Sequence, residues 1–162
     1  MKGRNGRASG QSVSARFYAP EGTGGYPRRN LVDHFNFEKL LKEVEGNRNI
    51  SALNFSYSTL GDEGVILLAK ALQKNTKLKT LHLADSLMTV KGLAAVLVML
   101  RTNKTLLTVD VSRNLFEFKC QAMLEDLKLS LRVNNMIHHA AEAKKKNSCQ
   151  QCSCIDSRDE AK

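Results

Sequence analysis

The sequence predicts an α/β fold, a short solenoid of about three strand–helix units with a helical cap at each end. Two observations lead to this fold class. Apolar residues recur at a regular interval, which we call the repeat period, and each period contains a short alternating stretch followed by a stretch with helical spacing. The chain has 162 residues. Because about 105 of them carry the pattern, the length suits one small domain with one modest core.

Three runs of the sequence share one apolar register. They begin at Ile50, Leu78 and Leu106, and each has apolar residues at its first, fourth and sixth places. A second recurring pattern places an asparagine between two apolar residues. Its four copies are Val44-Asn47-Ile50, Leu72-Asn75-Leu78, Leu100-Asn103-Leu106 and Leu131-Asn134-Ile137. The last copy arrives three residues late, so we expect a longer helix in the third unit.

The segment LKTLHLADSLMTVKGLAAVLVMLRTNKT, residues 78–105, resembles the ribonuclease-inhibitor-like class of leucine-rich-repeat proteins. The resemblance covers residues 50–137 and implies a leucine-rich-repeat solenoid with one strand and one α-helix per repeat. Members of this class, tropomodulin among them, bind unrelated partners, so the resemblance implies a fold and not an activity. The family usually has asparagine at the ninth place of each repeat, where this chain has Ser58, Ser86 and Asn114.

The pattern divides the chain into an arm, a domain and a tail. Residues 1–30 are rich in glycine and basic side chains and are expected to form a disordered basic arm. Residues 31–146 are predicted to form the leucine-rich-repeat domain, followed by a flexible, cysteine-containing tail at residues 147–162. Within the domain we expect a capping helix at 33–49, repeats at 50–77, 78–105 and 106–136, and a closing cap at 137–146.

Positive charge is concentrated in the arm. Residues 1–30 hold six Lys or Arg against one acidic residue, more than half of the net charge of +9. Such an arm can contact RNA or an acidic protein surface, or can simply improve solubility. Arg4, Arg7 and Arg16 also resemble a mitochondrial transit peptide, although glycines interrupt any amphipathic helix there.

The tail permits two modifications. Cys149, Cys152 and Cys154 could bind zinc together with His138 or His139, or could be acylated beside the basic residues 144–146. Neither pattern is specific, and we expect no metal and no cofactor. The sequence contains no run of 18 apolar residues, so no transmembrane segment is predicted.

The predicted partner-binding surface is the strand face and its adjoining turns. In repeats of this class the third, fifth and seventh residues of each strand point to the concave side. The predicted site residues are Asn54, Tyr57, His82, Asp85, Asp110 and Arg113. His82 and Asp110, with Ser112 or Ser56 nearby, could be imagined as a catalytic group, but no oxyanion site or enclosing pocket accompanies them. We therefore expect no catalytic residues.

The sequence thus predicts a noncatalytic protein-interaction module or scaffold subunit in the cytoplasm. One alternative is a peripheral subunit of a ribonucleoprotein or organelle assembly, for instance in the mitochondrion, with RNA bound by residues 1–30. The other alternative, from the resemblance to tropomodulin, is a scaffold of the cytoskeleton or cilium.

Overall fold

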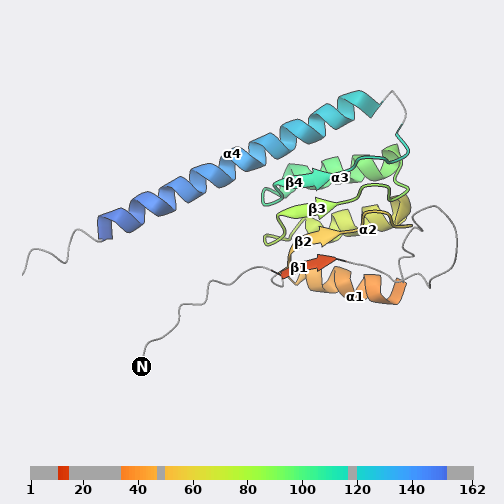
Figure 1. The fold of residues 1–162 in the computed structure, drawn as a ribbon, viewed down its shortest axis with the longest axis horizontal. Helices are drawn as coiled ribbons and strands as arrows, with labels where there is room; N and C mark the ends of the chain where they lie inside the picture. The colour runs from red at the N-terminus through yellow and green to blue at the C-terminus, as the bar shows by residue number, and fades with distance from the viewer. Residues whose placement is uncertain (1–10, 15–33, 47–49, 117–119, 153–162) are drawn as a thin grey trace, which may run out of the picture.

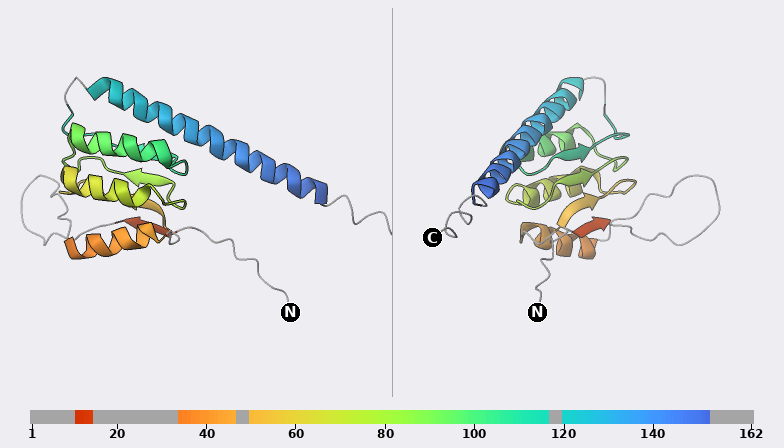
Figure 2. Two further views of the ribbon diagram at one scale, coloured as in Figure 1. Left: turned by 180° about the vertical axis from the view of Figure 1, so that it is seen from behind. Right: turned by 60° about the vertical axis from the view of Figure 1, so that its left-hand side comes forward.

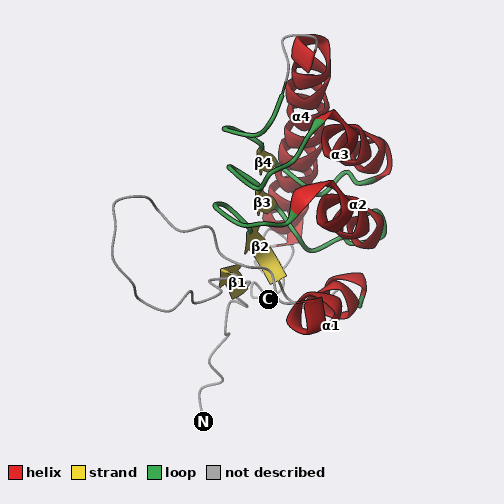
Figure 3. Ribbon diagram, turned by 90° about the vertical axis from the view of Figure 1, so that its right-hand side faces the viewer, coloured by secondary structure: helices red, strands yellow, loops and turns green. Residues whose placement is uncertain are grey.

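A layer of helices covers one side of a small parallel sheet in the computed structural model (Figures 1 and 3). The structure describes residues 11–14, 34–46, 50–116 and 120–152. The strands are β1 (Gln11–Ser14), β2 (Ile50–Asn54), β3 (Thr80–His82) and β4 (Thr108–Asp110). The helices are α1 (His34–Glu45), α2 (Gly61–Leu72), α3 (Val90–Thr102) and α4 (Gln121–Cys152).

The four strands lie in the order β1-β2-β3-β4, and every neighbouring pair is parallel. From β2 to β4, strand partners are one repeat period apart, since Ala52 pairs with Thr80 and Thr80 with Thr108. Each crossover from one strand to the next contains one helix, and α1, α2 and α3 therefore line up on the same side of the sheet (Figure 3).

The predicted fold class, a leucine-rich-repeat solenoid of about three strand–helix repeats with helical caps at both ends, is corrected by this arrangement. The described residues form four helices and one small, open sheet, and helices make up most of them. Within the described residues the chain does not return to the sheet after β4, because the junction Leu131-Asn134-Ile137 lies inside α4 instead of preceding a strand. One continuous helix of 32 residues therefore takes the place of the helix expected in the third unit and of the separate closing cap.

Two domain boundaries also differ from the prediction. Residues 11–14, expected within a disordered arm, form β1 and pair with β2. Helix α4 continues to Cys152, through the expected boundary between the cap and the flexible tail at residue 147. The capping helix expected at 33–49 corresponds to α1, and its junction asparagine, Asn47, lies outside the described residues.

The core lies between the sheet and the helices. Leu53, Leu81 and Val109 are partners on adjacent strands and are at most 9% exposed, so they form one buried row. Alternation along each strand sends these side chains inward and the intervening polar ones outward. The helices contribute the opposite wall of the core, for example Leu68 from α2 and Val96 from α3, both 1% exposed.

Buried asparagines connect the turns between the helices and the strands. The Nδ2 of Asn103 donates to Leu72 O at 2.7 Å and to Asn75 O at 3.0 Å. Its Oδ1 accepts from the backbone N–H groups of Thr105 and Leu106 at 2.9 and 3.0 Å. Asn75 repeats this arrangement one turn earlier, donating to Val44 O at 2.6 Å. The asparagines therefore satisfy backbone groups that the end of a helix leaves without partners.

Asn134 reproduces only half of this arrangement. Its Nδ2 donates to Asn103 O and Leu106 O at 3.1 and 2.9 Å, but its buried Oδ1 has no partner among the described residues. The reason is that Asn134 lies within α4, whose backbone N–H groups bond to carbonyls of the same helix. No described strand follows to supply the N–H groups that Asn75 and Asn103 bind.

Asp62, at the start of α2, caps the next helix in the layer. Its carboxylate accepts from Thr89 N at 2.8 Å, Thr89 Oγ1 at 2.6 Å and Gly92 N at 3.0 Å. Burial raises the pKa of Asp62, whereas these hydrogen bonds and the nearby Lys91 charge lower it. The lowering effects together are larger, so the pKa lies below the usual 3.8. The ionised carboxylate thereby stabilises the N-terminus of α3.

Asp62→Asn should reduce the free energy of unfolding by about 1 kcal/mol near pH 7, because the amide cannot replace a charged acceptor at a helix N-terminus. A lowered folded pKa means that this contribution is complete above the unfolded pKa and disappears as the pH falls through the folded pKa. The difference between wild type and variant should therefore shrink between about pH 5 and about pH 2, measured by urea unfolding at each pH.

The neighbouring exposed residue gives a matched control. Glu63→Gln removes one acidic charge from the same turn of α2 and should change stability by less than about 0.5 kcal/mol, as most surface substitutions do. A stability difference for Asp62→Asn that stays constant down to about pH 2 would show that the carboxylate charge is not responsible.

Candidate protein-binding surface

The six predicted site residues lie in two neighbouring rows. Asn54, His82 and Asp110 are register partners at the ends of β2, β3 and β4, and they form the strand row. Tyr57, Asp85 and Arg113 follow in the three turns, again one repeat period apart, and form the turn row. We call the two rows together the strand-side surface. The structure thus brings all six predicted residues to the carboxyl ends of the strands.

All three residues of the turn row have left-handed backbone conformations. The φ angles of Tyr57, Asp85 and Arg113 are 58°, 50° and 57°. This region is unfavourable for side chains larger than glycine, at a cost of about 1 to 3 kcal/mol each. It is maintained by bonds between turns, since Tyr57 N donates to Ala84 O at 2.8 Å and Asp85 N to Ser112 O at 3.0 Å. The turns of Tyr57 and Asp85 are therefore each fixed by the next turn along the sheet.

Asn114 ties the last two turns together. Its Nδ2 donates to Leu83 O at 2.7 Å and to Val111 O at 2.9 Å, and its Oδ1 accepts from Ser86 N and Met88 N at 3.0 and 3.1 Å. Ser58 and Ser86 make simpler bonds at the equivalent places: the hydroxyl of Ser86 donates to Leu83 O at 2.9 Å. One asparagine therefore bridges two turns where the two serines mainly bond within their own turn.

Tyr57 and Arg113 meet across the turn row. Arg113 Nη1 donates to Tyr57 Oη at 3.3 Å, although the residues are 56 positions apart and the turn with Asp85 lies between theirs. Tyr57 is 38% exposed, a large fraction for an aromatic side chain in this fold. The pair presents an aromatic ring and a guanidinium side by side, and tyrosine and arginine are both enriched among the residues that contribute most to binding energy at interfaces.

The strand row carries the charge of Asp110. The Ser112 N–H, 3.0 Å from the carboxylate, holds the pKa of Asp110 below its ordinary value. Burial raises this pKa, and the Ser112 hydroxyl and the charges of His82 and Arg113 lower it. Asn54 makes the same turn on β2, accepting from Ser56 N at 2.9 Å. The carboxylate of Asp110 is thus occupied in fixing its own turn, which suits a rigid recognition surface.

A groove beside β4 was not anticipated from the sequence. It has a volume of about 410 Å³ and lies between residues 109–114 and the side chains of Leu124, Leu127, Lys128 and Leu131 on α4. Asp110 and Arg113 belong to both the groove and the strand-side surface. The late final junction was the one available signal, because it indicates a longer helix where a further strand would otherwise cover the outer edge of β4.

The structure does not describe the side chains of Cys149, Cys152 and Cys154. Zinc binding and acylation of these cysteines therefore stay predictions. The potential ligand atoms of His138, His139 and Glu142 lie within 4.8 Å of one another. However, Lys79 Nζ lies 3.1 Å from Nε2 of His138, and a cation so close opposes metal binding at that nitrogen.

The predicted contact with RNA or an acidic surface through residues 1–30 also falls outside the described residues, apart from β1. Within the described part of the chain, none of the helices combines the length and apolar character that crossing a bilayer requires.

The fold and this surface define a helix-covered parallel sheet that presents two ordered rows of side chains at the carboxyl ends of its strands. No family model and no curated protein matches the sequence. Among solved structures, the chain is similar to actin-binding site 2 of leiomodin-1, with a TM-score of 0.58 and 14% identity. The match covers 73% of this chain and 83% of the leiomodin chain. At this identity the likeness concerns the fold alone, and membership of the ribonuclease-inhibitor-like class stays a prediction.

Proposed function

We propose that this chain is a noncatalytic protein-binding module of the cytoskeleton whose partner docks on the strand-side surface. One observation carries the proposal: six side chains of mixed chemistry are held in two rows by backbone pairing and by left-handed turns. Because the backbone that carries these side chains is already fixed, docking on them loses less conformational entropy than docking on a mobile loop would.

The chemistry of the rows favours a protein partner over a small molecule. Tyr57 and Arg113 supply an aromatic and a cationic anchor, while Asn54, His82 and Asp110 supply hydrogen-bonding groups. Catalytic and small-molecule sites usually have polar groups that converge in an enclosed pocket. The groups of the two rows instead extend across three strands. The fold likeness to actin-binding site 2 of leiomodin-1 makes actin the first partner to test.

Wild-type chain should sediment with filamentous actin, and Tyr57→Ala combined with Arg113→Ala should weaken that binding at least about tenfold, or about 1.4 kcal/mol. The reason is that the double change removes both anchors of the turn row while leaving the core intact. Cosedimentation over a range of actin concentrations gives the two dissociation constants.

Leu67→Ala combined with Lys70→Ala is the matched control, because both residues are exposed on α2 and the pair, like the test variant, loses one large side chain and one cationic charge. Both variants must melt at the wild-type temperature. If the Tyr57 and Arg113 changes reduce affinity less than about twofold, well under about 1.4 kcal/mol, the strand-side surface is not the site. If wild-type chain does not bind actin, the cytoskeletal assignment is wrong.

A further inference from the structure

Helix α4 has a second apolar face. Its inner side packs on the core through Leu127, which is 4% exposed, with Leu124 and Leu131 beside it. Four other large apolar side chains are exposed: Leu129 at 59%, Val133 at 42%, Met136 at 72% and Ile137 at 47%. Their spacing of i, i+4, i+7 and i+8 places them on one side of the helix, away from the core. We call these four residues the outer face.

Much of α4 extends beyond the rest of the fold. A helix of 32 residues is about 48 Å long at about 1.5 Å per residue. Its first half lies against α3 and the end of the sheet, and its second half projects past the strands (Figures 1 and 2). Asn134, Asn135 and His138, near the middle of α4, bond to the body of the fold. Isolated helical segments of this length are marginally stable in water, so a packing partner would stabilise the projecting part.

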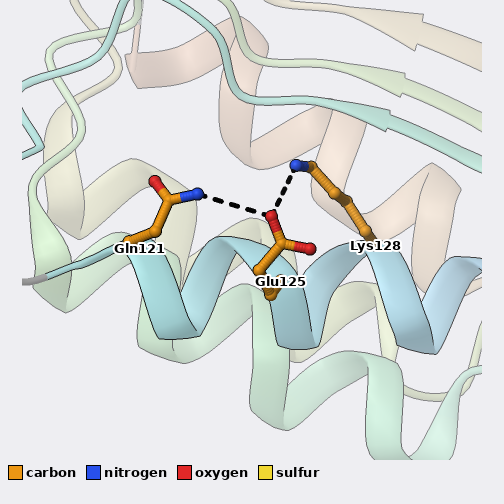
Figure 4. A network of polar contacts seen from close by, with 3 residues as sticks. All are labelled: Gln121, Glu125 and Lys128. Atoms are coloured by element: carbon orange, nitrogen blue, oxygen red, sulfur yellow. Dashed lines mark hydrogen bonds and ion pairs between the residues drawn. The ribbon is translucent and has the colours of Figure 1, made fainter.

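Charged residues lie at both ends of the described part of α4, with Lys128 and Arg132 following the first acidic pair and Glu142 preceding the last lysines. Glu125 and Asp126 lie near the start, and Lys144, Lys145 and Lys146 lie near the end of the part whose side chains are described. Glu125 is engaged within its own helix, accepting from Lys128 at 2.7 Å and from Gln121 at 3.4 Å (Figure 4). The hydrogen bond from Lys128 lowers the pKa of Glu125. Asp126 is therefore the acidic residue better placed for a contact beside the outer face.

A second copy of the same helix fits this pattern when it runs antiparallel. If a twofold axis passes between Val133 and Met136, Val133 of one copy faces Met136 of the other, and Leu129 faces the small side chain of Ala140. The same alignment places Asp126 opposite Ala143, so that its carboxylate lies next to Lys144 of the other copy. A parallel pair would instead place acidic residues against acidic and basic against basic, which is unfavourable.

We propose that the chain forms an antiparallel homodimer through the outer face of α4. The contact is isologous, so each copy contributes the same patch, and it closes at two copies. The outer face and the strand-side surface have no residue in common. The inference does not depend on the identity of the partner at that surface.

Sedimentation velocity of the full chain at increasing concentration tests the proposal. Wild type should approach twice the chain mass of 18.0 kDa. Val133→Asp combined with Met136→Asp should raise the dimer dissociation constant at least about tenfold. The matched control is Leu67→Asp combined with Val98→Asp, at positions 48% and 50% exposed on α2 and α3, which should dimerise like wild type. Circular dichroism should show retained helix in both variants.

A charge-reversal cycle reports the direction of the helices without touching the outer face. Asp126→Lys and Lys144→Asp should each weaken the dimer by repulsion, and the two changes together should restore it. Restoration would exclude a parallel pair, in which Asp126 and Lys144 lie far apart. Single changes that have no effect, or a double variant that is weaker than both, would overturn the antiparallel arrangement.

Other occupants of the outer face give different results. A wild-type chain that stays monomeric at all concentrations overturns the proposal. The proposal is also overturned if the chain is monomeric and the Val133→Asp and Met136→Asp variant loses actin binding while the Leu67→Asp and Val98→Asp control retains it. That result would assign the outer face to actin. A monomer that sediments with vesicles of phosphatidylcholine and phosphatidylserine, in a manner abolished by the outer-face change, would assign it to a membrane surface and equally overturn the dimer.

Discussion

Asn103→Ala should lower the free energy of unfolding by about 3 to 4 kcal/mol, because several buried backbone groups lose a side-chain partner at once. Asn103 is 2% exposed, and its amide bonds to the carbonyls of Leu72 and Asn75 and to the N–H groups of Thr105 and Leu106. Alanine cannot supply any of these bonds, and water does not reach the site without opening the turn. Urea unfolding followed by circular dichroism measures the change.

Asn54→Ala provides the comparison. Asn54 is exposed, and the bond that it makes to the backbone two residues ahead is local, so its loss should cost less than about 1 kcal/mol. Asn103→Ala with an equally small effect would show that the buried amide is replaceable, and the connection between neighbouring turns would then have to come from apolar packing.

Leu81→Ala and Leu83→Ala should each reduce stability by about 2 to 5 kcal/mol, the range for large truncations in a packed core. Leu81 is 1% exposed at the centre of β3, and Leu83 is 0% exposed immediately after it. Leu81 has a strand on either side, and Leu83 belongs to the same buried core, so neighbouring side chains limit collapse around the cavity. Thermal and urea unfolding of each variant gives the loss directly.

Leu67→Ala removes the same side chain from an exposed position on α2, where 48% of the residue is accessible. It should therefore cost less than about 1 kcal/mol. A comparable loss in all three variants would contradict the assignment of Leu81 and Leu83 to the core, and a loss below about 1 kcal/mol for Leu81→Ala would place that residue at the surface.

The spacing of apolar residues was enough to locate β2, β3 and β4 and to predict which residues would be neighbours across them. Leu53, Leu81 and Val109 occupy equivalent places in the sequence and are paired in the sheet. The same spacing placed Asn54, His82 and Asp110 in one row and Tyr57, Asp85 and Arg113 in the next. The left-handed turns of that second row were not predicted, because none of its three residues is glycine, the usual signal for positive φ.

The sequence by itself determined the interior of this protein, since apolar and asparagine positions that recur with every repeat period require the same local structure each time. Tertiary structure decided both ends of the sheet. Gln11–Ser14 carries little apolar signal, and it becomes β1 because the edge of β2 offers unpaired backbone groups. At the other end, helical spacing around Asn134 does not reveal whether a helix stops or continues. In the structure α4 continues past Asn134, and no strand follows it among the described residues. The groove beside β4 and the outer face of α4 are therefore both left exposed.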